Sequence, residues 1–132
     1  WLRSDDVDPF VVPEITLRPS AVLHDRTSTW VLLEGHPPDV DAERRRLAES
    51  GSFIEVDGPP ELPRQRWSVA QGDLRGLRPA DTGSAVLSIG VGRVWAEHAP
   101  PLPTTDPVVD LISTRRKQNF DRHGRCNPGR RP

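Results

Sequence analysis

The chain has 132 residues, of which 34% are hydrophobic and 28% are charged, and its formal net charge is -1. This length suits one compact domain with a single core, and the near-neutral charge argues against a nucleic-acid-binding protein, whose affinity depends largely on neutralising phosphates. One cysteine, Cys126, excludes an intramolecular disulfide and a cysteine-built zinc site, while the lack of a signal peptide and of any apolar run of about 20 residues predicts a cytoplasmic protein with no transmembrane segment.

The first segment, residues 1–14, is rich in aspartate and proline and is predicted to be a linker that arrives from an upstream domain. No methionine occurs in the chain, so we expect it to be a piece of a longer protein. The segments near 15–23 and 29–35 carry β-branched, leucine and tryptophan residues and are separated by a polar turn. They are predicted to form the two strands of a hairpin.

The next segment, 38–50, changes to helical spacing. Val40, Leu47 and Ala48 fall on one face, Asp39 is placed to cap the start, and Gly51 ends the segment, so we predict an amphipathic helix. Residues 52–56 form a predicted short strand that the turn Asp57-Gly58-Pro59-Pro60 ends. Residues 62–77 fit neither period, and we assign them a short helix or an irregular turn.

The stretch 84–91 is apolar and β-rich and is predicted to be a buried strand, in which Gly90 and Gly92 indicate a bulge or a close backbone approach. Val94 and Trp95 either extend that strand or pair as another. A proline-rich loop then leads to a predicted helix over 107–119, whose buried stripe would be Val108, Val109, Leu111 and Ile112. This order of elements predicts an α+β, ferredoxin-like fold: an antiparallel sheet of the segments near 15–23, 29–35, 52–56 and 84–95, with both helices on one face.

Candidate chemistry is sparse in most of the chain. The four histidines show no metal-ligand spacing. Glu97 and His98 could form an acid–base pair, but neighbours on an extended strand point to opposite faces, which favours structural roles. Gly90 and Gly92 lack the third glycine and the following helix of a phosphate-binding loop. The C-terminal region concentrates positive charge at Arg115, Arg116, Lys117, Arg122, Arg125, Arg130 and Arg131. This charge is either a solvated helix end, which suits the helix dipole, or a surface that faces a diphosphate or an acidic partner.

The last stretch, 120–130, reads FDRHGRCNPGR. It resembles the C-terminal signature F-D-x-x-G-x-x-N-P-G-[KR] of FAD-linked oxidases of the vanillyl-alcohol-oxidase type, and most of all that of the FAD-binding subunit of glycolate oxidase. Residues 87–103, LSIGVGRVWAEHAPPLP, are similar to the matching region of those proteins. Every fixed position of the signature is filled, by Phe120, Asp121, Gly124, Asn127, Pro128, Gly129 and Arg130.

This resemblance implies that residues 15–132 are the C-terminal cap domain of an FAD-dependent oxidase or dehydrogenase of small 2-hydroxy acids such as glycolate. The FAD would be bound mainly by the upstream domain, and the isolated cap would be inactive. The implied partners are that domain, a small-molecule substrate, a second flavoprotein subunit and an iron-sulfur subunit. The implied cofactor-side residues are Asn127, Pro128, Gly129, Arg130, Gly90 and Gly92, and no catalytic residue is assigned.

Two departures from the family pattern put the substrate in doubt, because Arg122 stands where many relatives have proline and Cys126 where they have an apolar residue. The alternative from another class is a non-catalytic, ferredoxin-like protein-interaction module that associates through its sheet or basic tail. An interface left open by a missing FAD domain should expose Trp95 and Trp67 in one patch beside Gly90 and Gly92.

Overall fold

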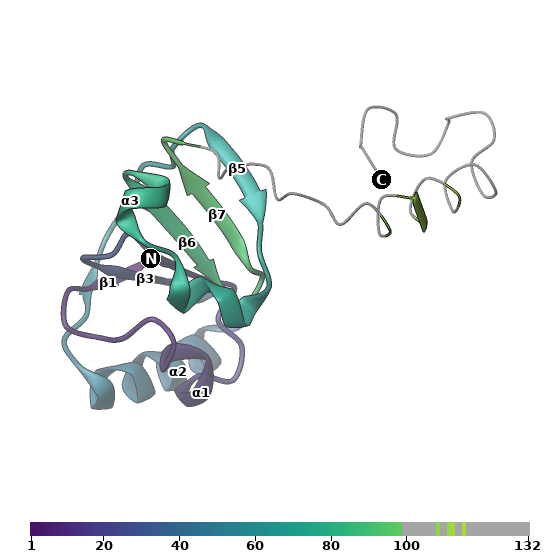
Figure 1. The fold of residues 1–132 in the computed structure, drawn as a ribbon. Coiled ribbons are helices and arrows are strands. Elements are labelled where there is room, and N and C mark those ends of the chain that lie inside the picture. Colours follow the sequence, from purple (N-terminus) through teal and green to yellow (C-terminus); the bar gives the residue numbers. More distant parts are fainter. Residues whose placement is uncertain (99–107, 109–110, 113–114, 116–132) are drawn as a thin grey trace. The chain divides into compact units, whose positions relative to one another are not determined.

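The computed structural model describes residues 1–98, 108, 111–112 and 115 (Figure 1). The chain divides into two compact units, Trp1–Pro100 and Pro101–Pro132. In the first unit, seven strands form one sheet in the order β4-β1-β3-β2-β6-β7-β5, and every neighbouring pair is antiparallel. This sheet, with its few helices, confirms the predicted α+β class.

The elements follow one another along the chain as short segments. They are β1 (Leu2–Ser4), α1 (Val12–Ile15), β2 (Ala21–His24), β3 (Thr29–Leu32), α2 (Pro37–Ser50), β4 (Ile54–Glu55), β5 (Gln65–Ser68), the 3-10 helix η1 (Gln71–Gly76), α3 (Pro79–Thr82), β6 (Ala85–Ile89) and β7 (Arg93–Ala96). The sheet therefore ends in two short edge strands, β4 and β5.

The N-terminal residues differ from the predicted linker. β1 lies inside the sheet between β3 and β4, with Leu2 opposite Val31 and also opposite Glu55. Val7 and Val12 are buried in the core. The aspartates and prolines of residues 1–14 face outward or form turns. Because these residues dominate the composition of the segment, the sequence predicts a linker and misses the few apolar side chains that pack in the core.

The predicted strand near 15–23 begins only at Ala21, because Pro13 stands in the first turn of α1 and its fixed φ suits a helix start. Of the two alternatives for 84–95, one extended strand or two paired strands, the structure has the second, the hairpin of β6 and β7. Residues 62–77, expected to be a short helix or a turn, contain β5 as well as η1. The difference at 62–77 arises at a short strand that its pairing with β7 defines.

Helix α2 confirms the predicted helix 38–50, but the residue at its N-cap is His36, and Asp39, the predicted cap, lies in its first turn. Pro37 and Pro38 occupy its first turn, and Gly51 follows its last residue. Leu47 is its one buried residue. Of the helix predicted at 107–119, the described residues Val108, Leu111, Ile112 and Arg115 are helical. Val108, Leu111 and Ile112 are exposed, so the buried stripe predicted for them is wrong.

The sheet carries apolar side chains on both faces, since neighbouring strand residues alternate between them. The main core lies on the face that also receives Val12 of α1, Leu47 of α2 and Leu74 of η1; α1 and α2 lie side by side there (Figure 1). The opposite face, here called the far face, holds a second cluster of Leu23, Trp30, Val86, Trp1, Val56 and Trp95.

Trp67 and Trp95 do not share one patch. Trp67 is half-buried against the main core, whereas Trp95 is half-buried in the far-face cluster. Trp67 stands opposite Val94, the neighbour of Trp95 in β7, so alternation places the two rings on opposite faces.

Candidate functional site

The two glycines singled out from the sequence form the turn between β6 and β7. Gly90 has φ +94° and Gly92 has φ +64°, a region that other residues rarely adopt. The carbonyl of Gly92 accepts a hydrogen bond from the Val69 N–H at 2.8 Å, and the Gln71 side chain donates to the Gly90 carbonyl. A Cβ on Gly92 would lie 2.2 Å from the Val69 carbonyl oxygen.

The close backbone approach expected at this pair is therefore present at Gly92. The turn leads into β7 and not into a helix, so no helix N-terminus is available there to meet a phosphate. Contacts within the chain account for Gly92, and this turn does not form a phosphate cradle. A flavin-side role for Gly90 and Gly92 stays a prediction, and Asn127, Pro128, Gly129 and Arg130 lie outside the described residues.

The side chains of Glu97 and His98 both approach Gly83, contrary to the expectation that they point to opposite faces. β7 ends at Ala96, so the alternation of a strand no longer applies to them. A Cβ on Gly83 would lie 2.7 Å from Glu97 Oε2 and 2.8 Å from His98 Nδ1. Glu97 Oε2 also accepts a hydrogen bond from the Ser84 N–H at 3.2 Å.

Glu97 borders an open cavity of about 510 Å³ near the start of β5, lined also by Glu61, Leu62, Pro63, Arg64, Gln65 and Ser84. A second open cavity, of about 560 Å³, lies beside the first half of α2 and includes Leu17, Arg18, Leu33 and Asp39 in its wall. Both walls combine charges of either sign with apolar side chains, so neither selects a ligand class by charge.

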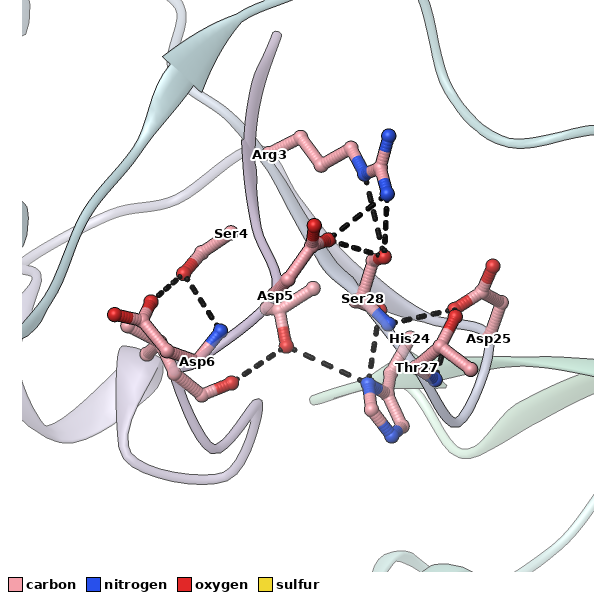
Figure 2. Close-up of polar contacts among 10 residues, drawn as sticks. Arg3, Ser4, Asp5, Asp6, His24, Asp25, Thr27 and Ser28 are labelled. Atoms are coloured by element: carbon pink, nitrogen blue, oxygen red, sulfur yellow. Dashed lines mark hydrogen bonds and ion pairs between the residues drawn. The ribbon is translucent and has the colours of Figure 1, made fainter.

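A polar network fastens β1 to the turn between β2 and β3 (Figure 2). Asp25 Oδ1 accepts hydrogen bonds from the N–H groups of Thr27 and Ser28, at 3.0 and 2.8 Å. Ser28 Oγ donates to Asp5 Oδ1 at 2.6 Å, and Arg3 forms an ion pair with Asp5 at 2.9 Å. The Ser28 hydrogen bond, helped by the charge of Arg3, holds the pKa of Asp5 below its usual value.

His24 lies beside this network, on the side of the sheet that carries the main core. Its Nδ1 is 2.9 Å from the Ser28 carbonyl oxygen and 3.4 Å from Thr29 Oγ1, which itself donates to the Val7 carbonyl (Figure 2). Because a carbonyl only accepts, Nδ1 carries the proton. Burial lowers the pKa of His24, and the Ser28 carbonyl opposes that effect only in part.

The lowered pKa of His24 predicts a loss of stability in mild acid. Unfolded histidine titrates near 6.5, so below that pH the unfolded chain binds more protons than the folded one, and the free energy of unfolding falls. The lowered pKa values of Asp5, Asp6 and Glu55 act only at more acidic pH, around and below 4.5.

The check is urea unfolding of the wild type and His24→Gln between about pH 7 and about pH 5.5. Glutamine keeps a side-chain N–H but cannot titrate, so the variant should lose less stability across this range. Equal losses in the two proteins would show that His24 does not carry the effect.

Among the described residues, no group of three or more histidine, cysteine, aspartate or glutamate side chains is arranged to hold a metal ion. No helix in the described ranges has the length and hydrophobicity to cross a membrane. Comparison with protein families, with curated proteins and with solved structures gives no match to this chain.

Proposed function

We propose that this chain is the C-terminal cap part of an FAD-dependent oxidoreductase that oxidises a small 2-hydroxy acid such as glycolate. The observation that carries the proposal is the tail at 120–130, in which all seven fixed positions of the F-D-x-x-G-x-x-N-P-G-[KR] signature are filled. The antiparallel α+β sheet of the first unit is compatible with a cap of this kind. The ferredoxin-like form of that fold is part of the proposal.

In this proposal Asn127 is the polar group directed to the flavin, and its turn is shaped by two neighbours. Pro128 fixes φ and Gly129 permits a positive φ. Arg130 follows with a positive charge. Bound FAD would supply the redox chemistry by accepting a hydride from the substrate carbon. We assign no catalytic base. Gly90 and Gly92 are proposed to lie beside the flavin without binding its phosphates, because their turn leads into a strand and does not form a phosphate cradle.

The partners in this proposal are an FAD-binding domain upstream of Trp1, a second flavoprotein subunit and an iron-sulfur subunit. The first of these can be checked in the gene, where roughly 200 upstream residues with a glycine-rich pyrophosphate loop are expected from ordinary domain sizes. A gene without such a region would contradict the cap assignment.

The second candidate is a non-catalytic interaction module. The observation that favours it is the open outer edge of β5, which pairs only with β7 among the described residues. Such an edge offers backbone donors and acceptors to another chain. The two candidates differ in one result, since only a cap would restore flavin reduction when mixed with the FAD-binding domain and lose that effect in Asn127→Ala.

A further inference from the structure

Three arginines gather where the sheet ends at β5. Arg66 lies in β5 opposite Trp95 of β7, and Arg93 lies in β7 opposite Ser68 of β5. Alternation along β7 puts Arg93 on the same face as Trp95, and pairing puts Arg66 there too, so both project from the far face. Arg64 directly precedes β5, and all three side chains are exposed.

These arginines have no carboxylate partner among the described residues. The four ion pairs among the described residues are formed by other arginines, namely Arg3, Arg44, Arg46 and Arg75. Glu61 and Glu97 border the same cavity as Arg64 but form no ion pair with it. In a chain of net charge -1, the far face at this end of the sheet is therefore locally positive around Arg66 and Arg93, while Glu61 and Glu97 lie near Arg64.

The same place offers a strand edge. The one strand that pairs with β5 among the described residues is β7, so the outer backbone N–H and C=O groups of β5 face no strand there. Gln65, Arg66 and Ser68 are exposed along it. Charged residues on an edge strand can discourage pairing in general, but they also select a partner of opposite charge.

We propose that the edge of β5, together with Arg64, Arg66 and Arg93, docks an extended acidic peptide segment of a partner protein, which adds to the sheet as an eighth strand. Main-chain hydrogen bonds would supply affinity and the arginines would select carboxylate side chains. A nucleic acid has no peptide backbone to pair with β5. A second copy would bring another set of arginines to the same edge, where like charges repel. This inference does not depend on the proposed flavin chemistry.

The test uses the 132-residue chain and a fluorescein-labelled peptide of alternating glutamate and valine, followed by fluorescence anisotropy. Three comparison probes accompany it: the same peptide N-methylated at every residue, a lysine–valine peptide and an oligo-dT strand. We expect saturable binding of the glutamate peptide that weakens with added salt. N-methylation should abolish it, because a peptide without backbone N–H groups cannot donate hydrogen bonds to β5 and its methyl groups block both of its edges.

The variant for this test is Arg66→Glu combined with Arg93→Glu, and its charge-matched control is Arg18→Glu combined with Arg45→Glu. Arg18 and Arg45 are exposed and form no ion pair within the described residues. The first variant should bind the peptide roughly tenfold more weakly or worse, from two reversed charge contacts, and the control should change little. Circular dichroism and urea unfolding establish that both variants fold. If the Arg66→Glu, Arg93→Glu variant does not fold, Arg66→Gln combined with Arg93→Gln takes its place.

Four results of the binding experiment would overturn the proposal. They are the absence of saturable binding, equal binding of the N-methylated peptide, equal weakening in the control variant, and oligo-dT binding as tight as that of the glutamate peptide. Sedimentation that shows a dimer of this chain, lost on Arg66→Glu, would assign the edge to a second copy and also overturn it.

Discussion

Replacing Gly92 with alanine is expected to lower the free energy of unfolding by about 2 to 4 kcal/mol. This loss has two sources, the positive φ, which is unfavourable for alanine, and the overpacking caused by the new Cβ. The new Cβ would meet the Val69 carbonyl oxygen at 2.2 Å, which is backbone and cannot rotate away. The measurement is urea unfolding of the variant against the wild type.

Gly90 and Gly76 provide matched controls for that result. Gly90 also has a positive φ, but a Cβ there would meet nothing within 4 Å, so Gly90→Ala should cost only about 1 kcal/mol. Gly76 has neither feature, and Gly76→Ala should be close to neutral. Equal losses at Gly92 and Gly90 would contradict the assigned contact between Gly92 and Val69.

Replacing Leu47 with alanine should cost about 2 to 5 kcal/mol, the usual range for a large-to-small change in a core. Leu47 is 0% exposed and is the buried residue through which α2 joins the main core. The same truncation at half-buried Val40 should cost about 1 kcal/mol or less, since it removes less buried area. Thermal or urea unfolding measures both, and a loss at Leu47 no larger than that at Val40 would show that α2 is not anchored there.

Helix α2 and strand β3 could be predicted because their signals are local. Helical spacing, prolines in the first turn and Gly51 after the last turn define α2 without reference to the rest of the chain. β1 and β5 could not, since a strand of three or four residues with mostly polar neighbours is defined by its partners. The main core therefore includes Val7 and Val12, which the predicted linker had left outside.

The contacts around the candidate site were predictable to different degrees. The glycine pair indicated a close backbone approach, which the structure places at Gly92. The Arg3–Asp5–Ser28 network was missed, although Asp25 followed by Thr27 and Ser28 is typical of a side-chain-capped turn. No local sequence pattern predicts that the side chains of Glu97 and His98 both approach Gly83, because this arrangement depends on where β7 ends.

The central claim is that this chain is a flavin-capping part of an oxidoreductase, and one titration tests it most directly. The separately expressed FAD-binding domain is mixed with increasing amounts of this chain, and flavin absorbance is followed during anaerobic addition of glycolate and other small 2-hydroxy acids. Cutting one protein into two pieces lowers their effective concentration, so recovery is expected only at high cap concentration.

The account predicts that flavin reduction appears with the wild-type chain and is lower with Asn127→Ala, while the stability of the isolated chain changes by less than about 1 kcal/mol, as for a surface substitution. No flavin reduction at high concentrations of a folded chain, or equal reduction with the wild type and Asn127→Ala, would contradict it.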